Sequence, residues 1–160
     1  MIKVVSGSVE TNSLNYSLGG GAAFAKGDLV RITLGGEIEL ATVKDFQAIA
    51  LADSTDFSDG DKGVPVAVLN ADTVLQVPCE AANAPDDYTI GENYGLVPTT
   101  KAQTLDLSDT TNEALQIVGK MGDDQWFDPD VDDAVTTGDG NSIYCKVVPA
   151  VLATRSAASA

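Results

Sequence analysis

The segment GDLVRITLGGEIELATV, residues 27–43, constrains the fold of this chain more than any other stretch. Two β-rich runs flank a Gly-Gly pair, a pattern that predicts a hairpin. A two-residue loop would set apolar side chains opposite carboxylates, whereas a three-residue loop at residues 34–36 makes both faces of the hairpin consistent. The three-residue loop gives the pairs Val30–Leu40, Arg31–Glu39 and Ile32–Ile38. We therefore predict that loop, with Gly36 in the left-handed conformation of a G1 bulge.

Other apolar runs between turn residues predict further strands. They lie at residues 46–51, 64–68, 74–77, 115–121 and 143–152. The turn Asn70-Ala71-Asp72 is expected to join two of these runs in a second hairpin. Residues 80–95 are expected to be loop. Thr110 and Glu113 match a capping box ahead of ALQIV, so a short helix and a strand both stay open there.

The length of 160 residues fits one domain. Frequent Gly, Val and Thr with few aromatics favour short strands and tight turns, so we expect a mainly β fold. It would be a small antiparallel β-barrel or β-sandwich built of hairpins, with long acidic loops. Residues 1–24 are expected to form an extended N-terminal arm that ends in a flexible Gly19-Gly20-Gly21 joint. Residues 25–152 would form the single β domain, and residues 153–160 a flexible C-terminal tail.

The net charge is −15 and it is unevenly distributed. The first 50 residues hold five acidic and four basic residues, a net charge of −1, which leaves −14 for the rest. Nucleic acid and anionic membrane surfaces are therefore unsuitable partners, because like charges repel. No apolar run approaches the roughly 18 to 20 residues of a membrane span, and no signal-peptide core is present. We expect a protein made and folded in a cytoplasm, with its near-neutral N-terminal third as the contact surface.

The chain contains no His, which excludes Ser-His-Asp and Cys-His catalysis and the usual zinc sites. Cys79 and Cys145 are expected to be reduced, buried residues rather than a disulfide. A glycosidase would need a carboxylate pair in a groove, usually with stacked aromatics, and the aromatics here are scattered. We therefore expect no enzymatic activity and no cofactor.

The segment WFDPDVDDAVTTGDGN raises the question of a metal site. Asp128, Asp130, Asp132 and Asp139 match positions 1, 3, 5 and 12 of an EF-hand calcium loop. Asp133 stands at position 6, where that loop requires Gly, and Asp139 is shorter than the usual Glu. A solvated acidic loop is the preferred interpretation, and weak calcium binding is the alternative. Residues 53–61 are also acidic, but their spacing fits no standard calcium loop.

Several segments together resemble the capsid decoration (cement) proteins of tailed bacteriophages. The resemblance runs through AKGDLVRI, IELATV, AIALAD and GVPVAVLNADTVLQVP, over about residues 24–78, and lies in strand order and turn placement. It implies a structural virion protein without catalytic residues, made in the host cytoplasm. Such a protein binds the capsid exterior and stabilises the shell by bridging subunits of the major capsid protein. It also implies self-association as a homotrimer, with a dimer as the alternative.

Proteins of this family often reach a capsid subunit with a terminal arm, so the apolar residues of the arm become candidate capsid contacts. These are Ile2, Val4, Leu14, Tyr16, Leu18 and Phe24. They could add a strand to an exposed sheet edge of the capsid.

Two other classes of function stay open. The first is another phage structural component, a tail-tube or head-fibre protein; a tail-tube protein would polymerise in isolation. The second is an acidic calcium- or carbohydrate-binding β module, which usually shows a signal segment and clustered aromatics.

Overall fold

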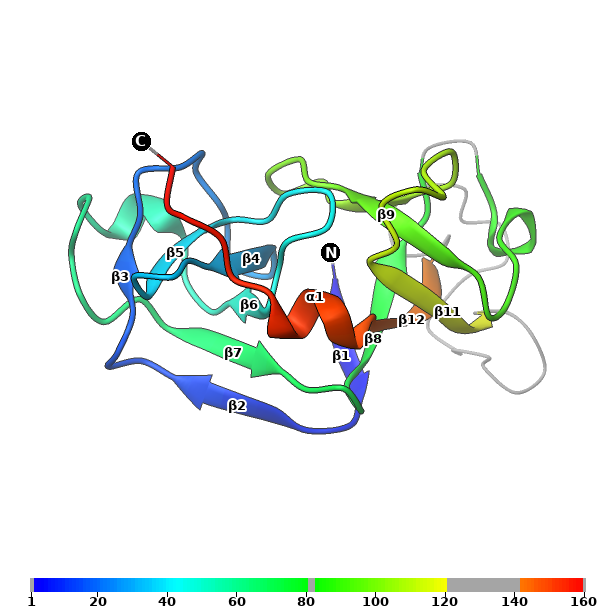
Figure 1. Cartoon of the computed structure of the whole chain (residues 1–160), viewed down its shortest axis with the longest axis horizontal. Helices are drawn as coiled ribbons and strands as arrows, with labels where there is room; N and C mark the ends of the chain where they lie inside the picture. Colours follow the sequence, from blue (N-terminus) through cyan, green and yellow to red (C-terminus); the bar gives the residue numbers. More distant parts are fainter. Residues whose placement is uncertain (1, 81–82, 121–141, 160) are drawn as a thin grey trace.

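The computed structural model describes residues 2–80, 83–120 and 142–159. This part of the chain is mainly β, as predicted, and forms two six-stranded sheets that lie one beside the other along the long axis (Figure 1). Its strands close no barrel, so the fold is the sandwich-like one of the two predicted architectures.

The N-terminal sheet takes all its strands from the first 69 residues. Its order is β2 (Val9–Asn12), β7 (Val66–Leu69), β6 (Ala48–Ala50), β4 (Leu29–Ile32), β5 (Glu37–Leu40) and β3 (Ser17–Leu18). The C-terminal sheet has the order β1 (Lys3–Ser6), β8 (Val74–Pro78), β12 (Ser142–Val147), β11 (Leu115–Lys120), β9 (Asn93–Val97) and β10 (Thr104–Asp106). The helical turns are η1 (Ser54–Asp56), η2 (Pro85–Asp87) and α1 (Pro149–Ala153).

The first predicted hairpin is confirmed, including its register. β4 and β5 make the pairs Val30–Leu40, Arg31–Glu39 and Ile32–Ile38. The amide of Gly36 donates to the carbonyl of Thr33 at 3.0 Å, and the φ angle of Gly36 is 78°. Glycine adopts this left-handed backbone without a Cβ clash, which is why the loop holds three residues.

The second predicted hairpin is wrong, although its strands exist. β7 pairs with β2 and β6, whereas β8 pairs with β1 and β12 in the other sheet. The turn at residues 70–73 therefore carries the chain out of one sheet and into the other. β1 and β2 make the same crossing antiparallel to it, so a two-stranded ribbon joins the sheets (Figure 1).

β4 shows how the two hydrophobic cores are divided. Side chains alternate along a strand, so Leu29 faces one side while Val30 and Ile32 face the other. Leu29 lies in a core that residues of both sheets share. Val30 and Ile32 lie in a second core that the N-terminal sheet and its loops enclose. All four residues of β4 are buried, which explains its continuous apolar character apart from Arg31.

The second half of the chain agrees with the sequence prediction at one strand and departs from it at two places. Residues 115–120 form a strand, so of the two options after Thr110 the strand is present. The run expected at residues 143–152 is a strand only to Val147, because Pro149 has no N–H for the ladder and instead begins α1. β9 begins at Asn93, inside the segment expected to be loop.

Both chain ends are placed against the sheets. The arm is extended as predicted, and its residues supply β1, β2 and β3. Residues 154–159, named the strap below, continue from α1 across the N-terminal sheet (Figure 1). The sequence prediction of a flexible tail did not anticipate the hydrogen bonds of the strap, which are described with the polar network below.

Candidate functional site

The six predicted capsid-contact residues divide between interior and surface. Ile2, Leu18 and Phe24 are buried, Tyr16 is half-buried, and Val4 and Leu14 are exposed. The buried residues are parts of the two cores, so they hold the arm to the body of the protein. Val4 and Leu14, with exposed fractions of 38% and 82%, are the two that the surface offers to a partner.

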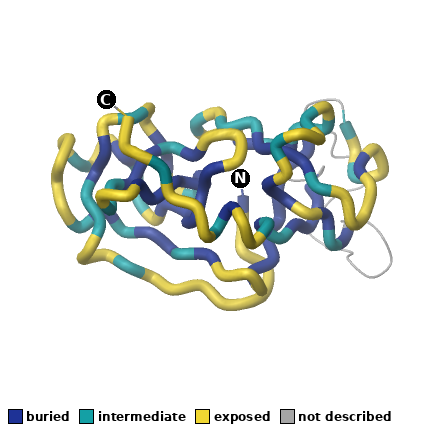
Figure 2. The backbone as a smooth tube through the Cα atoms, in the orientation of Figure 1, coloured by how far each residue is buried: buried dark blue, intermediate teal, exposed yellow. Residues whose placement is uncertain are grey.

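β1 and β2 are the outermost strands of their sheets, and both are exposed (Figure 2). Sequence analysis identified Val4 but missed Val5 and Val9, which are exposed beside it on the same two strands. An exposed edge strand is a template on which another chain can add a strand. Only four residues make up each strand, and such short edges resist unselective pairing.

The direction of the backbone groups of β2 follows from its neighbour. The amide of Leu69 in β7 donates toward β6, at 2.9 Å. Backbone groups alternate along an antiparallel strand, so those of Val68 face β2, where Glu10 is the opposite residue. Val9 and Thr11 therefore direct their N–H and C=O groups to the open side of β2.

A glycine corner fixes how β1 passes into β2. Gly7 has a φ of 83°, and a Cβ added there would lie 2.2 Å from the carbonyl oxygen of Asp72. The hydroxyl of Ser8 donates to the Asp72 carboxylate at 2.9 Å. The Asn70 side chain donates to the hydroxyl of Ser8 at 3.1 Å. These contacts lock the corner of the edge to the turn between β7 and β8.

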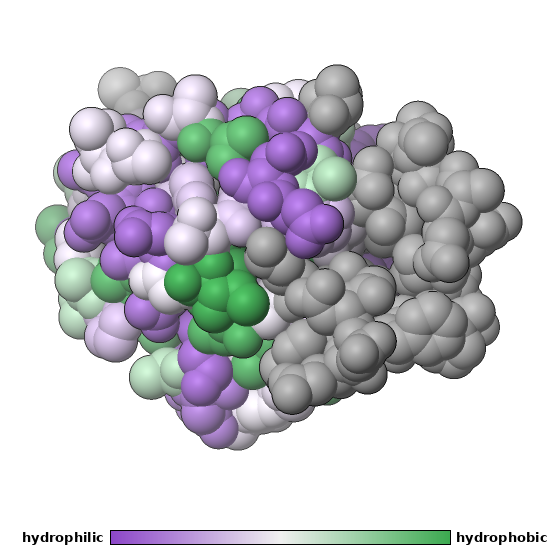
Figure 3. Space-filling view, turned by 90° about the vertical axis from the view of Figure 1, so that its right-hand side faces the viewer, coloured by the Kyte–Doolittle hydropathy of each residue, from purple (hydrophilic) through white to green (hydrophobic). Residues whose placement is uncertain are grey.

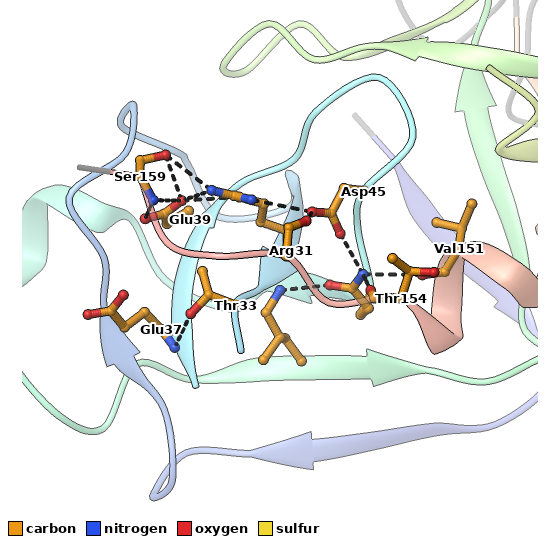
Figure 4. A network of polar contacts seen from close by, with 11 residues as sticks. Arg31, Thr33, Glu37, Glu39, Asp45, Val151, Thr154 and Ser159 are labelled. Atoms are coloured by element: carbon orange, nitrogen blue, oxygen red, sulfur yellow. Dashed lines mark hydrogen bonds and ion pairs between the residues drawn. The ribbon is translucent and has the colours of Figure 1, made fainter. Parts of the chain in front are cut away.

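A buried polar network lies between the N-terminal sheet and the strap (Figure 4). Arg31 donates from Nε to Glu39 at 3.0 Å and from Nη1 to Asp45 at 3.3 Å. The backbone amide of Ser159 donates to Glu39 at 3.0 Å, and the hydroxyl of Ser156 donates to Asp45. Residues of the strap thus donate hydrogen bonds to the buried carboxylates of Glu39 and Asp45. Without the strap, both carboxylates would have fewer hydrogen-bond donors.

The positive charge of Arg31 is held in place by its two acidic neighbours. Burial by itself lowers the pKa of Arg31, but hydrogen bonds and charge attraction from Glu39 and Asp45 outweigh burial and raise that pKa. The Gly19-Gly20-Gly21 run packs on the same network, because a Cβ at Gly19 would lie 2.5 Å from Cγ of Glu39. Packing against Glu39 thus requires small residues at Gly19 and Gly21, a reason that the predicted flexible joint did not include.

The two cysteines are free and buried, as predicted. Burial, with a smaller contribution from Asp87, raises the pKa of Cys79 to about 12. Burial and then the nearby Cys79 raise the pKa of Cys145 as well. Both groups stay protonated thiols at neutral pH, and a protonated thiol is a poor nucleophile.

A carboxylate pair occurs at Glu80 and Asp106. Burial is the main cause that raises the pKa of Glu80. A hydrogen bond with Asp106 and the negative charge of Asp106 raise it further. The Glu80 carboxylate also accepts from the amide of Leu107 at 3.2 Å, so backbone and neighbouring acid both engage it.

Metal ligation has no support in the described residues, where no group of three or more His, Cys, Asp or Glu side chains could hold an ion. The acidic residues 53–61 belong to that part of the chain. The calcium candidates Asp128, Asp130, Asp132 and Asp139 lie outside the described residues. None of the described helices is long and apolar enough to cross a membrane.

Two surface pockets lie where the sheets meet. The first has a volume of about 360 Å³ and is lined by Ile2, Ala25, Lys26, Asp28, Asp53, Lys101 and Gln103. The second, of about 510 Å³, lies beside α1 and the strap. On the end of the molecule seen in Figure 3, the visible described surface mixes hydrophilic side chains with separate apolar groups, one near the centre and one above it.

No family model, curated protein or solved structure matches the chain.

Proposed function

We propose that this protein is a structural component of a phage virion that binds the exterior of the capsid. It stabilises the shell by bridging neighbouring subunits of the major capsid protein, and it self-associates, with a homotrimer as the expected form. The observation that carries the proposal is the exposed edge that one N-terminal segment forms along both sheets. A segment that borders two sheets can engage two strands of a shell at once.

The open side of β2 supports an interface made by strand addition. Val9 and Thr11 direct backbone donors and acceptors outward, and Val9 adds an exposed apolar side chain. Main-chain hydrogen bonds supply affinity in such an interface, and alternate side chains supply specificity. The Gly7 corner holds this edge in one shape before any partner arrives, which reduces the ordering cost of binding.

The charge distribution supports an exterior position. A net charge of −15 opposes contact with packaged DNA, and most of that charge lies outside the N-terminal third. The edge strands β1 and β2 carry only Lys3 and Glu10 as charged residues. One positive and one negative charge leave the two strands without net charge, so the edge itself does not repel an acidic partner.

A proline substitution tests the edge. Thr11→Pro removes the outward N–H of β2 but leaves the ladder to β7 intact, because proline is tolerated on the open side of an edge strand. We expect the variant to keep the unfolding free energy of the wild type within about 1 kcal/mol. We expect its binding to purified expanded capsids, measured by co-sedimentation, to weaken about tenfold or more.

Thr11→Val is the matched control, since it changes the side chain and keeps the backbone donor. Its affinity for capsids should equal that of the wild type. Equal affinity of Thr11→Pro and the wild type would exclude the open side of β2 from the interface.

A further inference from the structure

Among the described residues, β2 is the open edge of the N-terminal sheet. The outer strand on the opposite side, β3, is covered by the chain between η1 and β7. The amide of Leu18 donates to the carbonyl of Asp61 at 2.8 Å. The amide of Gly63 donates to the carbonyl of Tyr16 at 2.9 Å. In the described part of the chain, no backbone hydrogen bond reaches the outward groups of β2, so a strand added to this sheet binds there.

A turn at each end limits the length of this edge. The glycine corner precedes β2 and redirects the chain toward β1. After β2, the side-chain oxygen of Asn12 accepts from the amides of Leu14 and Asn15, both at 3.2 Å. Such a turn bends the chain away from the line of the strand. The outward backbone groups that remain in line are those of Val9 and Thr11.

Pairing of β2 with β2 of a second copy meets a conflict at Glu10. One antiparallel, two-fold register uses both outward residues, with Val9 opposite the second copy's Thr11. In this register Glu10 lies opposite the second copy's Glu10, with Cα atoms about 4.5 Å apart. Like charges directly opposite each other destabilise a strand pair. Sliding the strands by two residues leaves only one outward residue of each copy paired with its counterpart and brings the corner or the turn into the ladder.

The charge of Glu10 is not compensated within the described residues. Its side chain is exposed and makes no hydrogen bond or ion pair there. The residue opposite it in β7 is Val68, which is uncharged. Lys3, the other charged residue of the edge, lies in β1 beyond the corner and belongs to the other sheet. A strand that pairs with β2 therefore meets one negative charge at one defined position.

We infer that Glu10 selects the partner of this edge. Its charge prevents two copies of the protein from pairing through β2, and it favours a strand of the capsid subunit that carries Lys or Arg opposite Glu10. The capsid as partner rests on the proposed function, whereas the exclusion of self-pairing does not. The expected homotrimer then uses another surface, since an edge that pairs with itself gives a two-fold dimer.

A charge swap between two copies tests the exclusion of self-pairing without capsids. Glu10→Lys reverses the charge, so it repels itself across the edge and attracts the wild type. Sedimentation velocity measures the two proteins separately and in an equimolar mixture. We expect a larger species in the mixture, with an association constant about tenfold above that of either protein alone. Thr11→Pro in either protein should abolish this gain, because it removes an outward N–H from the ladder.

Glu92→Lys is the matched control. Glu92 is also exposed and lies in the turn before β9, so its replacement changes the net charge equally but leaves β2 as it is. A mixture of wild type and Glu92→Lys should behave as the wild type alone. No gain in the mixture with Glu10→Lys, or a gain that persists with Thr11→Pro, would overturn the role of Glu10 at this edge.

Co-sedimentation with expanded capsids tests the basic residue of the partner. We expect Glu10→Lys to bind about tenfold more weakly than Glu92→Lys, because it sets like charges opposite each other. Equal affinity of these two variants would overturn the basic partner strand, and binding of the wild type would still support the proposed function. If the wild type binds no capsid, the proposed function fails, and the charge swap alone decides whether Glu10 excludes self-pairing.

Discussion

Gly7 is the residue on which the shape of the proposed interface depends. Replacing it with Ala adds left-handed strain and a contact of 2.2 Å with the Asp72 carbonyl. Gly60 has nearly the same φ, 81°, with nothing within 4 Å of an added Cβ. We expect Gly60→Ala to lower the unfolding free energy by about 1 kcal/mol and Gly7→Ala by about 3 kcal/mol or more. Urea denaturation measures both, and equal losses would show that the corner does not depend on the contact.

The buried thiols make a prediction about alkaline pH. The ordinary thiol pKa of 9.0 applies to the unfolded chain, whereas the folded protein raises the pKa of Cys79 to about 12 and that of Cys145 as well. Between these values the unfolded chain loses protons that the folded protein keeps, so stability is complete below pH 9 and falls as pH rises. The slope should approach about 1.4 kcal/mol per pH unit for each thiol.

Urea unfolding at pH 8, 9, 10 and 11 measures this slope. The burial of Tyr88 raises its pKa too and adds to the loss above pH 10. A Cys79→Ala, Cys145→Ala variant should therefore keep only the contribution of Tyr88 and show a shallower slope. An identical slope in the wild type and the double variant would contradict the assignment to the thiols.

The role of a single residue could be predicted where it depends on residues close to it in sequence. Gly36 was placed correctly, because its left-handed role follows from the turn and the four residues around it. Gly19 was not, because its cause is the side chain of Glu39, which lies 20 positions away in sequence and arrives through strand pairing. The contact candidates show the same limit of local reasoning. An apolar residue in a polar segment can be an exposed anchor such as Leu14 or a core residue such as Phe24, and only packing decides.

At the level of elements, turn chemistry predicted strands better than it predicted their partners. The β4–β5 register followed from matching the two faces of one hairpin. The same reasoning failed for β7 and β8, because β1 and β2 pair along them and draw each into a different sheet. The sequence does not reveal that competition, because β1 and β2 are only four residues long and lie in a segment without a clear strand pattern.

The strap is the element on which sequence and structure disagree most. The amide of Leu34 donates to the carbonyl of Ser156 at 2.9 Å, whereas a frayed tail would leave that amide exposed to water. We expect hydrogen exchange at Leu34 to be slowed by at least about tenfold, and truncation after Thr154 to abolish the protection. The amide of Gly36, which bonds within the hairpin, serves as the control and should not change. Unprotected exchange at Leu34 in the full-length chain would favour the frayed tail.

At the scale of the whole molecule, two sheets joined by one ribbon and one strap form an elongated body. The first pocket lies at their junction, and Lys26 and Lys101, which line it, are 75 positions apart in sequence. Composition could predict that the N-terminal third is nearly neutral, but it could not predict that these two residues line one pocket. The acidic charge and the fold class were predictable because they depend on composition and on alternation along strands.

Binding of the purified wild-type protein to mature capsids and to procapsids tests the central claim most directly. Both particles should lack their own decoration protein, and co-sedimentation should be measured at physiological salt. We expect saturable binding to the expanded mature shell, weak or absent binding to the procapsid, and a small oligomer in the absence of particles. Absence of binding to both particles, or polymerisation of the protein into rings or tubes on its own, would contradict the account.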